Sequence, residues 1–506
     1  MKHLKILSML LAILMLLPMV LAGCAKDDGG KNSPGQDVNV VKETEDKSSV
    51  YDSEIHDMHG HEFWFLVRET THQHLATNEV YAEELNGDKV NDAVFRRNAL
   101  LEEKYNCKIY EERNANPSTA IREQLIAGEY QYDFIYHGVS SLRPLSASNL
   151  LVDFYEIESI DLSKTWWDMN AVLGFSIAGK AYYVTGAGGT LDERASWVIY
   201  FNKDFIEKAD LESPYDLVRK GQWTIDKMYD YMMECKEDLN GDGVYEIGTD
   251  RFGYVGEQLN NWMHVAACNV HLSRMSADGD IEIPATVNKD VLNAWNALRP
   301  LLTSEYRNVT DNGGFGAGLA VFYGCNAGVL LNLAKKSINW GVVPMPKLNE
   351  EQEEYWTSVN SGWCYGYAIP VTTDSTPDYE QNGFTSGREQ AAYFLEAFFY
   401  QSLGTLQTAF YDQVLKYQVV KDSQSSEMLD IAFKNKLYDP VVIFNFGSIG
   451  TTLFSQTGSN GSGGAGYGSF KGTDVNYDTL VSTYESRVEA ARKALSNYIN
   501  YITQED

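Results

Sequence analysis

The chain has 506 residues and a formal net charge of −29. Such an acidic excess excludes a nucleic-acid-binding surface, because phosphates need basic side chains, and it argues against loose adsorption to anionic lipid. The length is too great for one small core and is consistent with two lobes.

Residues 1–23 have the layout of a secretory signal peptide. Lys2 and Lys5 precede an apolar run that ends at Leu21-Ala22-Gly23, and the chain turns polar after Cys24. The run is short for a membrane span of roughly 20 residues. Leu-Ala-Gly-Cys resembles the bacterial lipobox, which implies that Cys24 is acylated and becomes the N-terminus. An ordinary signal peptide with a chance Cys is the alternative. We expect a lipid-anchored protein on the extracellular face of the cell membrane.

Residues 24–51 predict a disordered tether. This stretch has many charged, Gly and Ser residues and almost no large apolar side chains, so it cannot bury a core. We expect it to hold a folded body of about 455 residues off the membrane.

The remaining five cysteines are an odd number without CxxC spacing, which disfavours a zinc site and predicts buried free thiols.

The body begins with alternating strand and helix patterns. Residues 62–67 and 107–110 are strand-like, and helical spacing covers 90–105 between them. A helix from Pro117 to Gly128 then leads to a buried strand at 132–136. This alternation predicts a parallel sheet covered by helices. Ligands of such sheets lie beyond the carboxyl ends of the strands.

Two further helices are expected toward the end of the chain. One is strongly apolar and begins at Arg388. The other carries a helical stripe that extends from Leu480 to Ile502. The Gly/Ser-rich segment 457–469 between them lacks the Lys of a phosphate-binding loop, so we expect a surface loop.

Four phrases in order resemble the extracellular solute-binding proteins, family 1 type, of carbohydrate ABC importers. They are "LVDFYEIESIDLSKTWWD" from Leu151, "WVIYFNKDFIEKADLESPYDLVRKGQWTIDKMYDYM" from Trp197, "DLNGDGVYEIGTDRFGY" from Asp238, and "NWGVVPMPKLNEEQEEY" from Asn339, the last followed by "AIP" at 368–370. The match covers residues 60 to 420 and is vaguer over the last 80 or so.

The resemblance implies an α/β, two-lobed periplasmic-binding-protein-like (type II) fold with a hinge. Residues 52–160 and 356–425 would form lobe 1, residues 161–355 lobe 2, and a helical segment at 426–506 would complete the lobes. The family's members close around a ligand held between the lobes and dock on a membrane permease. We therefore expect a monomeric carbohydrate receptor without an organic cofactor. A receptor for a peptide or another polar solute is the alternative.

Sugar recognition needs planar polar groups for hydroxyls and flat rings for the apolar sugar faces. The aromatic content of 12% fits this need. Trp166, Trp167 and Trp223 lie in the family's recurrent phrases, and we expect them to be scaffold. The candidate ligand-binding residues are Glu69, His137, Asp192, Arg194, Glu257, Asn261, Trp262, Trp363 and Tyr365.

The segment from Asp238 to Asp250 resembles the front half of an EF-hand loop. Oxygen-bearing side chains occupy positions 1, 3 and 5, and Gly243 at position 6 permits the turn. The back half departs from the pattern, because Thr249 stands at position 12. Either the loop bulges so that Asp250 completes the shell, or the metal binds weakly or not at all. The predicted ligands of a structural Ca²⁺ are Asp238, Asn240, Asp242, Val244, Glu246 and Asp250.

Five histidines gather near the start of the body, at positions 56, 59, 61, 72 and 74. A transition-metal receptor would draw imidazoles from both lobes rather than from one stretch, so we expect a surface cluster.

A secreted glycosidase is the rival class, and it would need two carboxyl groups about 5 or 6.5–9.5 Å apart. Adjacent Asp192 and Glu193 would make a poor pair in a strand. A surface adhesin is a third alternative.

Overall fold

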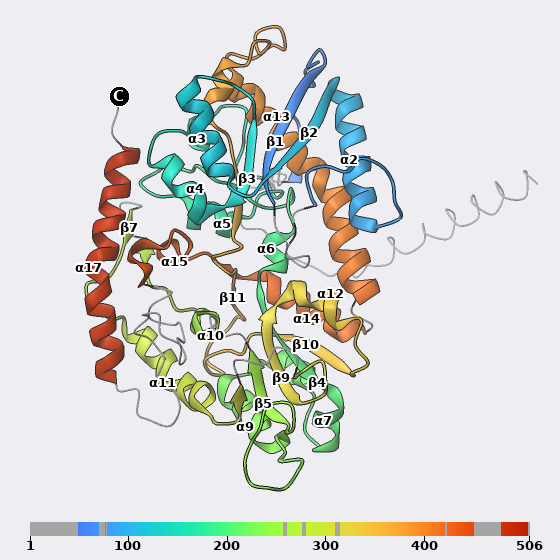
Figure 1. The fold of residues 1–506 in the computed structure, drawn as a ribbon, viewed down its shortest axis with the longest axis vertical. Helices are drawn as coiled ribbons and strands as arrows, with labels where there is room; N and C mark the ends of the chain where they lie inside the picture. Colours follow the sequence, from blue (N-terminus) through green and yellow to red (C-terminus); the bar gives the residue numbers. More distant parts are fainter. Residues whose placement is uncertain are drawn as a thin grey trace, which may run out of the picture. The chain divides into compact units, whose positions relative to one another are not determined.

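A computed structural model describes residues 49–69, 76, 78–256, 261–275, 280–308, 314–419, 422–449 and 477–503. The chain divides into two units, Met1–Asp46 and Lys47–Asp506. The fold described is that of the second unit (Figure 1). The predicted signal peptide, Cys24, the tether up to residue 48 and the Gly/Ser-rich segment 457–469 lie outside the described residues.

The first sheet has the strand order β12-β3-β1-β2. Its strands are β1 (His61–Arg68), β2 (Cys107–Asn114), β3 (Phe134–Gly138) and β12 (Tyr365–Ala368). Strand β1 runs parallel to both β2 and β3, whereas β12 runs antiparallel to β3. The three strands predicted from the sequence are confirmed. The fourth comes from a part of the chain more than 200 residues away.

Four helices accompany this sheet, and local sequence signals explain where they begin and end. The helices are α2 (Lys89–Tyr105), α3 (Pro117–Ala127), α4 (Val139–Ser146) and α13 (Gly387–Ser402). The Asp88 side chain accepts a hydrogen bond from the Asn91 N–H and so caps α2. Helix α3 starts at Pro117 and stops at Gly128, whose φ of 71° is one that glycine adopts without strain. Both helical predictions here are confirmed.

The second sheet has the order β10-β4-β9-β5-β8. Its strands are β4 (Trp197–Asn202), β5 (Phe252–Gly256), β8 (Arg307–Asn308), β9 (Ala320–Asn326) and β10 (Trp340–Pro344). Strand β5 runs parallel to β8 and β9, and β4 runs antiparallel to β9 and β10. Figure 1 shows the two sheets at opposite ends of this unit, with β11 (Thr357–Ser358) between them.

Three chain segments cross between the sheets and bond to one another. Strand β11 pairs in parallel with β13 (Lys436–Leu437). Ser196 forms an antiparallel bridge with Val359, and the Asn360 N–H donates to the Ala195 carbonyl at 3.0 Å. The crossings at 195–197, 357–360 and 435–438 therefore form one hinge. This arrangement matches the two-lobed α/β fold that the sequence predicts.

The remaining elements complete both lobes. They are η3 (Phe154–Glu156), α5 (Met169–Phe175), α6 (Leu191–Arg194), α7 (Lys203–Lys208), α8 (Pro214–Arg219), α9 (Ile225–Cys235), α10 (Asn261–Ala267), β6 (Arg274–Met275), β7 (Ile281–Glu282), α11 (Lys289–Thr303), η4 (Ala327–Val329), α12 (Leu330–Leu333), η5 (Val371–Ser375), η6 (Leu403–Val419), α14 (Ser423–Lys434), α15 (Pro440–Ile443), η7 (Phe446–Ser448) and α17 (Tyr477–Ile502).

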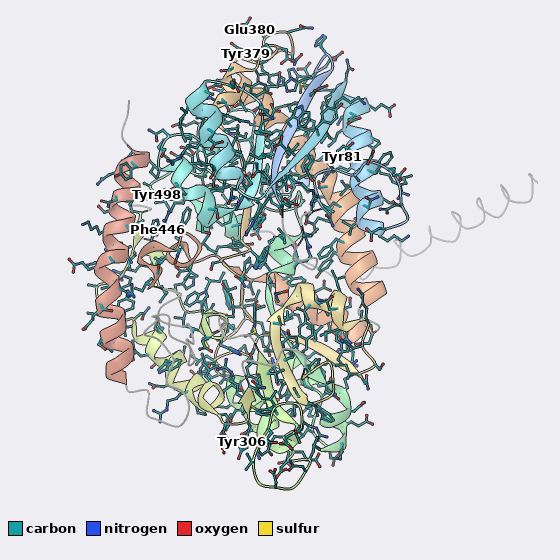
Figure 2. The ribbon with its side chains drawn as sticks, in the orientation of Figure 1. Tyr81, Tyr306, Tyr379, Glu380, Phe446 and Tyr498 are labelled. Carbon is teal, nitrogen blue, oxygen red and sulfur yellow. The ribbon has the colours of Figure 1, made fainter. Side chains whose placement is uncertain are left out.

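Helix α17 contacts both lobes. Its Arg492 Nε donates to the Ile283 carbonyl at 2.8 Å, and its Tyr498 hydroxyl lies 2.8 Å from Ser146 Oγ. Tyr498 also packs against Phe446, with ring centroids 5.8 Å apart (Figure 2). The buried side of α17 includes Tyr484, Val488, Ala491, Leu495 and Ile502, which confirms the predicted stripe.

The core agrees with two further expectations. Trp166, Trp167 and Trp223 are buried, as expected of scaffold residues. The five cysteines other than Cys24 are all free and buried. Among the helices of the described residues, none combines the length and the apolar character that a membrane crossing needs.

Candidate functional site

Three aromatic side chains stack in a row at one edge of the first sheet. The rings of Trp363 and Tyr365 are 6.2 Å apart and inclined by 16°. The rings of Tyr365 and His137 are 5.7 Å apart and inclined by 20°. We call Trp363, Tyr365 and His137 the aromatic row. Tyr365 and His137 are buried, whereas Trp363 is half-buried. The row therefore presents its Trp363 end to the outside.

The strand register explains how the row assembles. Tyr365 opens β12 opposite Gly138, which closes β3, so the antiparallel pairing places Tyr365 beside His137. Arg68 closes β1, the parallel neighbour of β3. Its Nη1 donates to the Tyr365 hydroxyl at 3.0 Å, and its guanidinium carbon lies 5.4 Å from the Trp363 ring centroid. The carboxyl ends of the parallel strands thus meet at the row, where a ligand of such a sheet is expected.

His137 is a neutral group available for hydrogen bonding. Burial, and secondly the charge of Arg68, lower the pKa of His137 to about 4, against a smaller opposing contribution from the backbone of Gly138. A neutral imidazole has one donor and one acceptor nitrogen. The Nδ1 atom of His137 is buried and has no hydrogen bond of acceptable geometry within the described part of the chain. Buried polar atoms are nearly always satisfied, so this nitrogen is suited to a ligand or a water molecule.

Glu69 lies one residue beyond Arg68. Its side chain is exposed, and its N–H extends the ladder by donating to the Asn114 carbonyl at 3.0 Å. Glu69 therefore stands at the same edge of the sheet as the row, directly after the strand that lies next to β3.

Arg194 is committed to a buried ion pair within the protein. Its Nη2 lies 2.5 Å from Glu79 Oε1 and also donates to the Ala76 carbonyl at 2.9 Å. Its Nε donates to Thr190 Oγ1 at 3.0 Å. These bonds hold the segment near residue 79 against α6, so Arg194 supports the first lobe from the inside.

Asp192 is also buried and paired. Its Oδ2 lies 2.5 Å from Lys436 Nζ on β13. The sequence analysis did not find Lys436. Nothing in its local sequence distinguishes it from a surface lysine, and its partner lies 244 positions away.

Asn261 and Trp262 belong to the second lobe. Both are buried at the start of α10. Asn261 Oδ1 accepts a hydrogen bond from Arg307 Nη2 at 3.0 Å, whereas Asn261 Nδ2 has no partner within the described ranges. Helix α10 packs against β11 of the hinge. Glu257 lies outside the described residues. The structure thus brings His137, Trp363 and Tyr365 together in one lobe and places Asn261 and Trp262 in the other.

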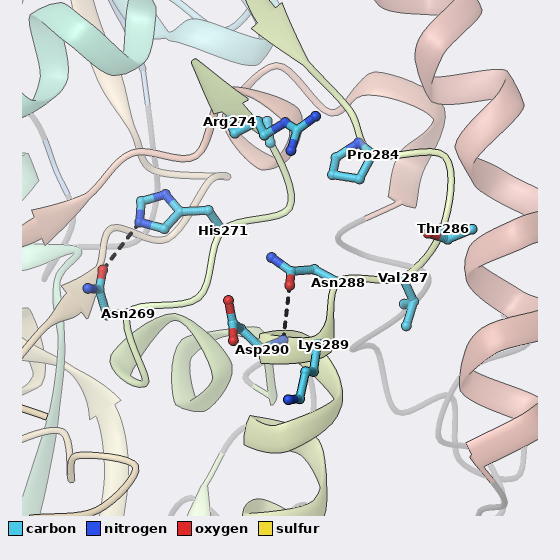
Figure 3. Close-up of a pocket in the computed structure, with 10 residues that line it drawn as sticks. Asn269, His271, Arg274, Pro284, Thr286, Val287, Asn288, Lys289 and Asp290 are labelled. Carbon is cyan, nitrogen blue, oxygen red and sulfur yellow. Dashed lines mark hydrogen bonds between the residues drawn. The ribbon is translucent and has the colours of Figure 1, made fainter. Parts of the chain in front are cut away.

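A polar hollow of about 620 Å³ lies in the second lobe (Figure 3). Two local hydrogen bonds shape it: His271 Nε2 lies 3.2 Å from Asn269 Oδ1, and Asn288 Oδ1 caps α11 by accepting from the Asp290 N–H at 3.0 Å. A second hollow of about 680 Å³ shares Arg274 with the first and is also lined by residues of α17. The residues that line these hollows are mostly exposed, in contrast to the buried end of the aromatic row.

The calcium-like loop is held by its own carboxylates. Asp238 accepts hydrogen bonds from the N–H groups of Gly241 and Gly243, each at 2.7 Å. Asp250 is buried and accepts from the Leu239 and Glu246 N–H groups. Across the part of the chain that the structure describes, no three His, Cys, Asp or Glu side chains converge on a metal position. Calcium binding by this loop stays a prediction.

The expectation of a histidine cluster at the surface is wrong for His61. This residue is buried at the start of β1, with Nδ1 2.9 Å from Asp378 Oδ2 and Nε2 3.5 Å from Asp133 Oδ1. His59 is exposed, as expected, and His56 is half-buried. The other two histidines of the cluster, at positions 72 and 74, lie outside the described residues.

Comparison with known proteins bears on the fold. No protein-family model and no curated protein matches the chain. The chain is similar to the crystal structure of M. tuberculosis UspC, with a TM-score of 0.52 and 14% identity over 85% of this chain and 100% of that one. It thus shares a fold with UspC.

Two further structures are less similar in shape. One is the ABC substrate-binding protein Lmo0181 from Listeria monocytogenes in complex with cycloalternan, with a TM-score of 0.48, 13% identity and coverage of 88% and 100%. The other is the GacH receptor of Streptomyces glaucescens GLA.O, described unliganded and with acarbose, with a TM-score of 0.46, 10% identity and the same coverage.

Proposed function

We propose that this protein is the substrate-binding receptor of an ABC importer and captures a carbohydrate between its two lobes. The observation that carries the proposal is the aromatic row with Arg68 and the neutral His137 at its edge. The two-lobed fold and the four sequence phrases that resemble carbohydrate receptors support it. The ligand would contact both lobes when they close, so binding would favour the closed form.

The chemistry of the row suits a sugar. A pyranose presents an apolar face that packs on an indole, and Trp363 is the half-buried end of three near-parallel rings. Its hydroxyl groups need partners that both donate and accept, which a neutral imidazole provides. Arg68 adds guanidinium donors beside the same rings. Asn261 and Trp262 of the second lobe would complete the contacts on closure.

The sequence also motivates proposals about location and partners. We propose that Cys24 is lipid-modified, that residues 24–51 tether a monomeric body to the outer face of the membrane, and that the closed body delivers its ligand to a permease. Labelling of the whole chain by a radioactive fatty acid in a bacterial host tests the anchor. The label should vanish in Cys24→Ser, and label retained in that variant would refute the proposal.

A structural Ca²⁺ at the loop that begins at Asp238 is proposed as well. Extracellular calcium is abundant, so a weak site would suffice. Calcium should raise the melting temperature, and Asp238→Asn should abolish that rise. A melting temperature indifferent to calcium would contradict a calcium site here.

A thermal-shift screen tests the proposed function. The unit from residue 49 onward would be heated with oligosaccharides, peptides or divalent metals. A ligand at 100 times its dissociation constant adds about 2.7 kcal/mol of stability. A shift with one glycan series, and recovery of that glycan intact, would support a sugar receptor rather than a hydrolase. A shift with peptides alone would leave the receptor proposal standing and overturn its ligand class.

A further inference from the structure

Three carboxyl groups surround one lysine at the hinge. Lys436 Nζ lies 2.8 Å from Asp168 Oδ2, 2.5 Å from Asp192 Oδ2 and 3.4 Å from Glu193 Oε1. The side chains of all four residues are at most 15% exposed. We call these four residues the hinge cluster. With every carboxyl ionised, a single ammonium would face three negative charges.

The hinge cluster joins the first lobe to the crossing segments. Asp168 caps the start of α5. Asp192 and Glu193 lie in α6, which leads directly into the crossing at 195–197. Lys436 belongs to β13, which pairs with β11 at the second crossing. A change of charge here therefore acts where the lobes are connected.

Three described neighbours of the hinge cluster bear on its charge. The Tyr438 hydroxyl donates to Asp168 Oδ2 at 3.0 Å. Burial, followed by the charges of Asp192 and Asp168, raises the pKa of the Cys364 thiol well above its ordinary value, so Cys364 is neutral. The nearby Arg194 is committed to Glu79. Each of these neighbours is thus neutral or already paired.

Two carboxyl oxygens of the hinge cluster lack partners. Asp192 Oδ1 and Glu193 Oε2 are buried, and neither has a hydrogen-bond donor among the residues described. Two neighbouring carboxylates that are both ionised and buried repel each other, and each pays for desolvation. One proton between them removes a charge and satisfies both oxygens with a single hydrogen bond.

We propose that Asp192 and Glu193 share one proton at neutral pH and that this proton holds α6 against the hinge. Burial, and next the charge of Asp192, raise the pKa of Glu193 well above its ordinary value of 4.5. A raised pKa means that the folded state binds the extra proton, so the stabilisation is complete in acid. It is lost as the pH rises through the raised pKa of Glu193.

Loss of the proton should loosen the hinge. An excess of two negative charges would then lie between α5, α6 and β13, and their repulsion would weaken the attachment of the crossing segments. The shared proton does not depend on the proposed function, so its test gives the same answer whether or not the protein binds a sugar.

Infrared spectroscopy of the unit Lys47–Asp506 tests the shared proton. A protonated carboxylic acid has a carbonyl stretch that ionised carboxylates lack. The difference spectrum of wild type minus Glu193→Gln at neutral pH should contain that band, and so should wild type minus Asp192→Asn. Glu396→Gln is a matched control, because burial raises the pKa of Glu396 to about 7 away from this cluster. The carbonyl band in the difference spectrum of wild type minus Glu396→Gln should have a frequency different from that of the band assigned to the hinge cluster.

Thermal melting provides the second readout. The melting temperature of wild type should fall as the pH rises above neutral, and Glu193→Gln, which cannot lose a proton, should flatten that fall. If Glu193→Gln does not fold, Asp192→Asn carries the same test. Absence of the band from both difference spectra, or an unchanged pH dependence of melting in the folded variant, would overturn the proposal.

Discussion

Two histidines of the same sheet show how position decides a residue's role. His61 opens β1 and His137 is the last residue but one of β3, so they lie at opposite ends of neighbouring parallel strands. Both are buried. Asp133 and Asp378 surround His61, whereas His137 stands beside Arg68 and has a nitrogen without a partner among the described residues. At the amino end of the sheet the histidine bonds to protein carboxylates, whereas at the carboxyl end the proposed function gives the histidine a ligand to bind.

The shifts of pKa in the two histidines are opposite. Burial alone lowers the pKa of His61, but the hydrogen bonds and charges of Asp133 and Asp378 outweigh burial and raise it above 6.5. Burial and Arg68 act in the same direction on His137 and lower its pKa to about 4. The histidine at the amino end of the sheet therefore takes up a proton more readily than the histidine at the carboxyl end.

Removal of His137 should have the largest effect on binding. His137→Ala should weaken affinity for the ligand found in the screen at least tenfold, about 1.4 kcal/mol, because a desolvated hydrogen bond is lost. Titration calorimetry measures the affinity at a temperature where the variant is folded, because truncation of a buried side chain also lowers the melting temperature. Unchanged affinity would place the ligand elsewhere.

Removal of His61 should show the reverse pattern. His61→Leu leaves the buried Asp133 and the half-buried Asp378 without their imidazole, which should cost about 1–3 kcal/mol of unfolding free energy. Denaturant unfolding measures this loss. His271→Leu is a matched control, because His271 is exposed and surface substitutions are nearly neutral. A reduced ligand affinity in folded His61→Leu would contradict the assignment of His61 to structure and of His137 to ligand binding.

The stabilisation by His61 and the ligand affinity of the site at His137 should depend on pH in different ways. The raised pKa of His61 means that its stabilisation is present below its ordinary pKa of 6.5 and fades as the pH rises through the folded value. The melting difference between wild type and His61→Leu should therefore shrink toward alkaline pH. Ligand affinity should stay flat from about pH 5 to 8, because His137, with a pKa of about 4, is neutral there. An affinity that rises or falls near pH 6.5 would contradict a neutral His137.

Substitution of Arg68 should have the smallest effect of these. Arg68→Met removes a nearby positive charge, so the pKa of His137 should rise toward its ordinary value of 6.5 while burial still holds it below. Nuclear magnetic resonance of the imidazole protons measures this shift. No upward movement of the pKa would show that burial acts alone.

The sequence predicted the elements that local patterns encode. Strand β1, helix α3 with its Pro117 start and Gly128 stop, and the apolar stripe of α17 all follow from periodicity and caps. Placement of His137 at the carboxyl edge followed from the parallel-sheet rule. The proximity of Trp363 and Tyr365 to it depends on β12 joining the sheet, which local sequence does not reveal.

The features that the sequence did not predict depend on contacts between residues far apart in the chain. His61 forms a hydrogen bond with Asp378, which lies 317 positions later in the chain. Asp192 meets Lys436 across 244 positions, so an expected cleft residue lies in an internal cluster instead. In both cases the chemistry depends on which side chain the fold brings close, and a single sequence does not record that choice.

The most direct test of the account is a titration of wild type, Trp363→Ala and Trp64→Ala with the glycan found in the screen. Trp64 is a matched control, because it is also half-buried but stacks on Tyr110 of β2, at a ring distance of 4.8 Å. The account predicts at least a tenfold loss of affinity in Trp363→Ala and wild-type affinity in Trp64→Ala. Wild-type affinity in Trp363→Ala would contradict the aromatic row as the binding site.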